Sequence, residues 1–215
     1  MKNSQIKNFL SALGLHRKEL LAWSLYDWGN SAYVTIVMAT ILPIYYSEVA
    51  TQGLEPYTKT ALWGYTSGIS LLISAIFAPF LGTLADNYGI KKKMLGFFLI
   101  IALIATACLF LVDHNQWILA SILFIISSFG FYSANIFYEA ILPHICNEKE
   151  VDKVSTGGYA LGYMGGGIML VLIVFFINPK TSFIKEQLLA IKLSFVLVST
   201  WWAIFSIPLF KIIIL

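Results

Sequence analysis

Charged residues are scarce in this sequence: only 12% of its 215 residues are Asp, Glu, Lys or Arg. Soluble globular domains carry about 25% charged residues. Together with 59% hydrophobic residues and a mean hydropathy of +0.80, this scarcity excludes an ordinary soluble domain and indicates a protein that contacts lipid. The 14 basic and 11 acidic residues are too few and too scattered to form a nucleic-acid surface, so we expect no nucleic-acid partner.

Residues that could bind a metal or perform catalysis are also few. The two cysteines, Cys108 in an apolar run and Cys146 in a short loop, have neither the spacing of a metal site nor a plausible partner in each other. His114 and His144 lie in loops without a partner at metal-ligand spacing. We find no phosphate-binding glycine loop, zinc motif or Ser/His/Asp set. The sequence therefore predicts no disulfide, metal, cofactor or enzymatic activity.

The first 19 residues lack the continuous apolar core of a signal peptide. Their apolar residues fall at helical spacing, at Ile6, Phe9, Leu10 and Leu13. Basic residues accompany them at Lys2, Lys7, Arg17 and Lys18. This pattern predicts a cytoplasmic amphipathic segment over residues 1–19 that lies at the membrane interface.

Six apolar stretches are each about the length of a membrane-spanning helix, which needs roughly 20 residues. The predicted spans lie near residues 28–47, 60–81, 94–112, 117–138, 158–178 and 193–210. The second, third and fourth connections are short, so consecutive helices should be antiparallel neighbours. We therefore predict an all-α membrane protein in which residues 1–215 form one six-helix transmembrane domain.

The basic residues predict the orientation. If the amino terminus lies in the cytoplasm, so do Lys2, Lys7, Arg17, Lys18, Lys91, Lys92, Lys93, Lys149, Lys153 and Lys211, and only Lys59, Lys180, Lys185 and Lys192 lie outside. Basic residues are enriched in cytoplasmic connections, so both termini are predicted to be cytoplasmic. Aromatic residues near the predicted span ends are interpreted as anchors in the headgroup zone, namely Trp23, Trp28, Tyr45, Tyr46 and Trp117.

Residues 82–92, GTLADNYGIKK, occupy the predicted cytoplasmic turn between the second and third spans. They resemble the signature of the major facilitator superfamily. Gly89 would allow a tight turn, Gly82 a close helix approach, and Asp86 a contact with nearby cations. The predicted gating residues are Gly82, Asp86, Gly89, Lys91 and Lys92. Alternatively, this turn only fixes orientation, and Asn87 and Ile90 replace the usual basic residues.

Three further stretches resemble the "unknown major facilitator" family, which includes the fungal autophagy-related vacuolar amino-acid effluxers. They are residues 21–46 (LAWSLYDWGNSAYVTIVMATILPIYY), 137–143 (FYEAILP) and 155–167 (STGGYALGYMGGG). The resemblance spans nearly the whole chain. It implies the amino-terminal half of the major facilitator fold, transport of a small solute by alternating access, and efflux of neutral amino acids.

Polar residues recur on single faces of the first and fourth spans. Asp27, Asn30 and Val34 share one helical face, and Asn135 and Glu139 share another. The resemblance implies that these two helices line the central cavity. The candidates for substrate or proton contact are therefore Asp27, Asn30, Asn135, Tyr138 and Glu139, with Glu139 favoured for proton coupling. Alternatively, the two carboxylates only cap helices or pair with Lys18 or Lys153.

Glycines at 158, 162 and 166 recur every four residues along the fifth span. One face of that helix therefore lacks side chains, which predicts close helix packing by Gly158, Gly162 and Gly166. A more specific interpretation is that this glycine face slides or bends against a neighbouring helix during alternating access. Pro43, Pro79 and Pro208 each remove a backbone donor within a span and can kink it.

Major facilitator transporters have twelve helices, so six spans predict a half or truncated transporter. Its expected partners are the lipid bilayer, a small-molecule substrate and a second six-helix half. The alternative is a non-transporting six-helix remnant or a membrane interaction subunit. We expect the chain in a bacterial inner (plasma) membrane.

Overall fold

The computed structural model describes residues 11–87 and 89–214, and this part of the chain is helical without strands. Six helices in this described part are long and apolar enough to cross a membrane. They confirm an all-α membrane protein with six spans. Helical structure follows from the solvent, because a backbone in hydrocarbon must satisfy its hydrogen bonds within itself. The first ten residues of the predicted amphipathic segment lie outside the described residues.

The first span is a composite of α-helical and π-helical turns between residues 18 and 50. Its parts are α2 (Lys18–Tyr33), η1 (Val34–Thr40), α3 (Ile41–Tyr45) and η2 (Tyr46–Ala50). The other helices are α4 (Pro56–Asn87), α5 (Lys91–Cys108) with η3 (Leu109–Leu111), α6 (Trp117–Glu139), the short α7 (Leu142–Ile145), α8 (Val151–Ile177) and α9 (Gln187–Ile212). Most of these helices are longer than the spans predicted from the sequence, because polar residues at the ends of the apolar stretches are helical too.

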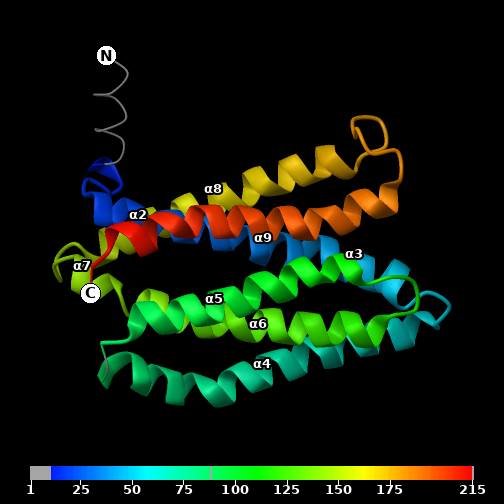
Figure 1. The fold of residues 1–215 in the computed structure, drawn as a ribbon, viewed down its shortest axis with the longest axis horizontal. Coiled ribbons are helices and arrows are strands. Elements are labelled where there is room, and N and C mark those ends of the chain that lie inside the picture. The colour runs from blue at the N-terminus through cyan, green and yellow to red at the C-terminus, as the bar shows by residue number, and fades with distance from the viewer. Residues whose placement is uncertain (1–10, 88, 215) are drawn as a thin grey trace.

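The helices form two groups that run side by side (Figure 1). In one group α2 packs against both α8 and α9, and in the other α6 packs against both α4 and α5. Contacts between α5 and α9 join the groups. The start of α2 and the end of α9 lie at the same end of the bundle (Figure 1), as an even number of spans requires.

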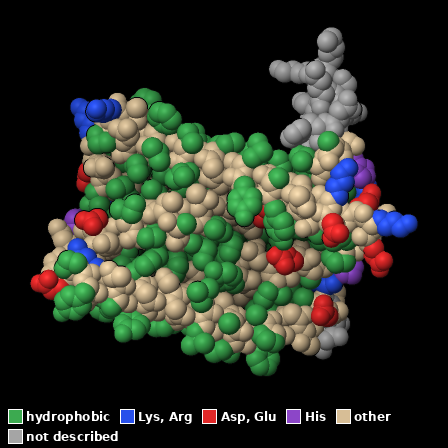
Figure 2. Space-filling view, turned by 180° about the vertical axis from the view of Figure 1, so that it is seen from behind, with side chains coloured by type: hydrophobic (Ala, Val, Ile, Leu, Met, Phe, Trp, Pro, Cys, Tyr) green, Lys and Arg blue, Asp and Glu red, His purple; other side chains and the backbone are tan. Residues whose placement is uncertain are grey.

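The outer surface is largely apolar. Large hydrophobic side chains are exposed along the helices, for example Phe80 on α4, Phe97 on α5 and Phe175 on α8. Figure 2 shows green hydrophobic side chains over much of one face, with the charged side chains gathered toward the two ends. Such a surface suits contact with lipid tails between two aqueous zones.

Three aromatic residues expected at the membrane interface are instead buried inside the bundle. Trp23, Tyr45 and Tyr46 are at most 2% exposed. Trp23 Nε1 donates to the Tyr138 carbonyl oxygen at 3.2 Å, and the Tyr45 hydroxyl donates to the Val112 carbonyl oxygen at 2.7 Å. The interpretation as anchors is wrong for these residues, because their polar atoms find partners within the protein instead of in the headgroup zone.

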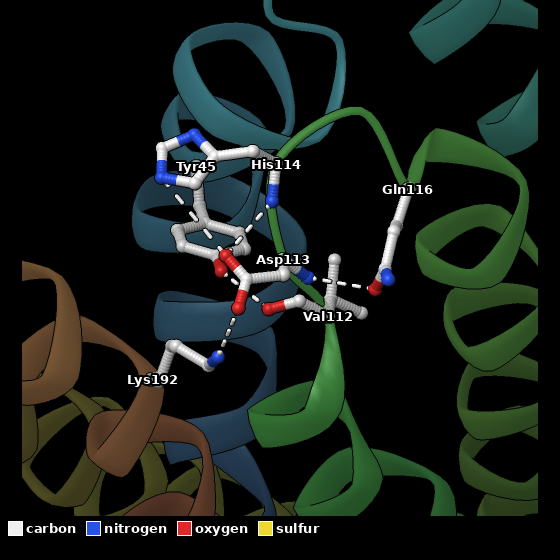
Figure 3. A network of polar contacts seen from close by, with 6 residues as sticks. All are labelled: Tyr45, Val112, Asp113, His114, Gln116 and Lys192. Carbon is white, nitrogen blue, oxygen red and sulfur yellow. Dashed lines mark hydrogen bonds and ion pairs between the residues drawn. The ribbon is translucent and has the colours of Figure 1, made fainter.

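A polar network joins α9 to the connection between η3 and α6 (Figure 3), at the end of the bundle opposite to the start of α2 (Figure 1). Lys192 Nζ of α9 lies 3.2 Å from Asp113 Oδ2 in the connection between η3 and α6, and the His114 amide donates to Asp113 Oδ1 at 2.9 Å. The Asp113 amide in turn donates to Gln116 Oε1 at 2.9 Å. Two interactions lower the pKa of the Asp113 carboxyl below its ordinary value. The hydrogen bond from the His114 amide has the larger effect, and the hydrogen bond from Lys192 has the next largest. This network fixes the first turns of α9 to the neighbouring connection.

Candidate solute-binding site

A pocket of about 200 Å³ opens between α2, η1, α6 and α8. It is lined by Asp27, Asn30, Ser31, Val34, Thr35, Phe131, Asn135, Tyr159 and Tyr163. The first and fourth spans thus contribute polar residues to the same cavity. Of the five residues predicted to contact substrate or protons, Asp27, Asn30 and Asn135 line this pocket.

Asp27 is the one acidic residue that lines the pocket, and it is 8% exposed. In the described part of the chain its carboxylate has no ion-pair partner, including Lys18 and Lys153. The Lys153 ammonium group donates instead to the Ser11 carbonyl oxygen at 3.2 Å. A carboxylate removed from water without a partner is costly. Asp27 is therefore suited to receive a cationic group or a proton.

Two amide side chains connect the opposite walls of the pocket. Asn30 Nδ2 on α2 donates to Asn135 Oδ1 on α6 at 3.0 Å. Each amide has further hydrogen-bonding capacity, since this bond leaves the Asn30 carbonyl oxygen and the Asn135 amino group. The pair therefore offers both hydrogen-bond acceptors and donors beside the Asp27 carboxylate.

The π-helical segment η1 begins at the edge of the pocket. Val34 and Thr35, its first two residues, line the pocket, and the Thr40 hydroxyl donates to the Thr35 carbonyl oxygen at 2.6 Å. Pro43 follows in α3 and has no amide hydrogen to continue the regular ladder. Short π-helical insertions often occur at functional sites. The irregular turns widen the helix where it borders the cavity.

Tyr138 and Glu139 do not line the pocket, although both were predicted to contact the substrate or protons. The Tyr138 ring stacks on Trp23 with ring centroids 4.5 Å apart, and its hydroxyl donates to the Trp23 carbonyl oxygen at 3.2 Å. Tyr138 therefore joins α6 to α2. Glu139, the last residue of α6, is exposed beside Tyr159. It follows Asn135 by one helical turn, toward the end of α6 and beyond the residues that line the pocket.

The signature turn has few contacts of the expected kind within the described chain. Asp86 is exposed and has no ion pair among the described residues. Gly82 faces open space, since no atom lies within 4 Å of a Cβ built there, and Gly89 lies in the turn. The lysines contact other elements: Lys91 contacts His144 of α7, and Lys92 Nζ donates to the Ile213 carbonyl oxygen at 2.6 Å.

The glycine face of α8 packs directly on the first span. A Cβ at Gly158 would overlap the Trp23 ring, and one at Gly162 would overlap the Asp27 carboxylate. At Gly166 the nearest atoms belong to Ser31 and Thr35. These glycines bring α8 close enough for its tyrosines to form one wall of the pocket.

The sequence-based prediction missed several lining residues, namely Ser31, Thr35, Phe131, Tyr159 and Tyr163. Helical spacing contained a signal for some of them. Ser31 follows Asp27 by four residues, and Phe131 precedes Asn135 by four. The two tyrosines alternate with the glycines of α8, which drew attention to packing rather than to binding.

Comparisons with known proteins agree with this architecture. The family described as "Vacuole effluxer Atg22 like" matches residues 56–214. An uncharacterized MFS-type transporter, YxiO of Bacillus subtilis (strain 168), is 36% identical over 90% of this chain and 46% of its own length. Autophagy-related protein 22 of Pichia angusta is 21% identical over 89% of this chain and 47% of its own length.

More distant similarity extends to the multidrug resistance protein MdtG of Escherichia fergusonii, which is 30% identical over 74% of this chain and 38% of its own length. The chain spans about half the length, or less, of these curated relatives. No solved structure matches it.

Proposed function

This chain belongs to the Atg22-like vacuole effluxer family, and we propose on that premise that it is one half of a transporter that moves a small solute by alternating access. The family consists of transporters rather than enzymes. The pocket between α2, α6 and α8 would form one wall of the central cavity, and a second six-helix half would supply the other wall. Both termini would lie on the cytoplasmic side of a bacterial inner membrane.

Neutral amino acids are the proposed solutes, exported from the cytoplasm. What supports this proposal is the buried Asp27 carboxylate, which faces the pocket and has no cationic partner in the described chain. The ammonium group of an amino acid would form a charge-assisted hydrogen bond with it. Asn30 and Asn135 would bind polar atoms of the solute, and Val34 and Phe131 would contact its apolar side chain.

The experiment is leucine transport into proteoliposomes. One preparation contains this chain alone, and the other contains this chain with the carboxyl-terminal half of YxiO. We expect transport in the second preparation, inhibited by leucinamide, which keeps the ammonium group, and not by N-acetylleucine, which lacks it. Asp27→Asn should lower the rate at least about tenfold, because hydrogen bonds to charged groups contribute about 1.5–3 kcal/mol.

The matched control is Asp152→Asn, which removes an exposed carboxylate from the first turn of α8 and should leave the rate unchanged. Equal inhibition by leucinamide and N-acetylleucine would contradict the role of Asp27 as the ammonium partner. If neither preparation transports any member of an amino-acid panel, the proposal of transport by this chain fails, and a non-transporting remnant or membrane interaction subunit becomes the better interpretation.

A further inference from the structure

A second cavity lies between α5 and α9, whose ribbons run side by side in Figure 1. It is a groove of about 430 Å³ whose walls include Leu99 and Leu103 of α5 and Ala203 and Ile207 of α9. It contains no carboxylate and no amide side chain. Its single hydroxyl, on Ser206, donates to the Trp202 carbonyl oxygen at 2.7 Å. The groove therefore offers an almost purely apolar surface.

Small residues create this groove while the two helices remain in contact. Gly96 and Ala203 lack side chains that could fill it, and a Cβ at Gly96 would already lie 3.2 Å from the Phe210 ring. Nearby, the Ser199 hydroxyl on α9 donates to the Leu103 carbonyl oxygen on α5 at 2.9 Å. The groove is thus a surface depression between packed helices and not a gap between separate units.

The groove opens toward the lipid-facing surface. Ile100 and Ile207, which line it, are 57% and 47% exposed. In a bilayer, the solvent at this depth is hydrocarbon. An empty apolar depression would lose the dispersion contacts of its lining, so filling it with hydrocarbon is favourable. An acyl chain is therefore the occupant that fits its walls.

One end of the groove carries positive charge. Lys211 lines this end, is exposed, and has no ion-pair partner among the described residues. Lys92 lies one helical turn before Gly96, and its Nζ reaches across to the Ile213 carbonyl oxygen at 2.6 Å. That single bond leaves Lys92 with further donors and its full charge. The two lysines therefore flank the place where the apolar groove meets the membrane interface.

We propose that this groove binds an anionic phospholipid. One acyl chain lies along the apolar walls, and the phosphate faces Lys211 and Lys92. Basic residues beside transmembrane helices attract anionic lipids, at about 1 kcal/mol per lysine near the surface. A long lysine side chain can also extend from the apolar zone to the interface. This site is separate from the solute pocket and does not depend on the proposed transport activity.

Native mass spectrometry tests the proposal. The purified full chain is delipidated and mixed with equal amounts of phosphatidylglycerol and phosphatidylcholine, and the ratio of the two bound lipids is measured. We expect phosphatidylglycerol to dominate. Lys211→Gln should lower the ratio about fivefold, the equivalent of about 1 kcal/mol. Lys149→Gln removes an exposed lysine from the connection before α8, at the same end of the bundle, and should leave the ratio unchanged.

The apolar part of the site has its own variant. Ala203→Phe fills the groove and should lower retention of both lipids, and Ala203→Leu should lower it less, with thermal unfolding reporting whether each variant folds. An unchanged ratio in Lys211→Gln, or an equal fall in Lys149→Gln, would overturn the headgroup site. Unchanged lipid retention in folded Ala203→Phe would overturn the acyl-chain site.

Discussion

Two helices of this bundle, α8 and α4, both carry glycines four residues apart, and the structure uses them differently. On α8, Gly158 and Gly162 lie directly against α2, so that a Cβ at either position would overlap its side chains. On α4, Gly64 and Gly68 have no atom within 4 Å of a built Cβ. The spacing is the same, but only α8 finds its partner within the described chain.

The comparison shows that glycines four residues apart predict a helix face that another helix can approach closely. The spacing does not predict which helix packs there. Helix α4 contacts α6 through aromatic and hydroxyl side chains: the Trp63 and Phe124 ring centroids lie 5.0 Å apart, and Thr66 Oγ1 lies 2.8 Å from Ser121 Oγ. The Tyr46 hydroxyl of η2 also lies 2.8 Å from Ser121 Oγ. The smooth face of α4 remains available to helices outside this chain. A second six-helix half, as proposed above, is the expected occupant.

The largest effect is expected where a Cβ added to a glycine of α8 would overlap α2. Gly162→Leu would place a branched side chain against the Asp27 carboxylate and the Ser31 hydroxyl, and both side chains would have to turn away from their present positions to admit it. Overpacking of this kind costs about 1–3 kcal/mol, so the thermal unfolding temperature of the purified chain should fall clearly. Gly167→Leu lies on the same helix with open space around it and is the control. Equal unfolding temperatures for the two variants would contradict the glycine contact.

A smaller effect is expected for the hydroxyl contact of α4. Thr66→Val keeps the shape of the side chain and removes its hydroxyl, while Ser121 retains Tyr46 as a partner. Hydrogen bonds between membrane helices contribute about 0.6 kcal/mol on average, and the free energy of unfolding should fall by about that amount. Thr60→Val, which removes an exposed hydroxyl on the first turn of α4, provides the comparison. A loss as large as that of Gly162→Leu would mean that hydroxyls hold α4 as firmly as glycines hold α8.

The smallest effect on this chain is expected on the open face of α4. Gly68→Leu should leave unfolding of the isolated chain within about 0.5 kcal/mol of the parent, as substitutions away from packed features usually do. Co-purification with the carboxyl-terminal half of YxiO should nevertheless decrease, because the added side chain would keep the second half from approaching α4. Normal co-purification would show that this face is not the contact.

The sequence predicted the candidate pocket in part. Helical spacing placed Asp27 and Asn30 on one face, and they line the same cavity as Asn135. Their roles in transport stay a prediction. Glu139 was grouped with Asn135 on the same basis, but it lies at the end of α6 and is exposed. The spacing of residues along one helix does not predict where the neighbouring helix lies. Here the position of α8 determines which residues of α2 and α6 line the pocket.

Hydropathy by itself determined that six helices cross a membrane, because a chain segment in hydrocarbon must satisfy its backbone internally whatever its neighbours are. The tertiary structure decided the rest. It buried Trp23, Tyr45 and Tyr46, which looked like interface anchors, and it placed Gly162 against Asp27 while leaving Gly68 open. These outcomes depend on contacts between residues far apart in the chain. A hydropathy pattern records how apolar each segment is, but not which side of it another helix will cover.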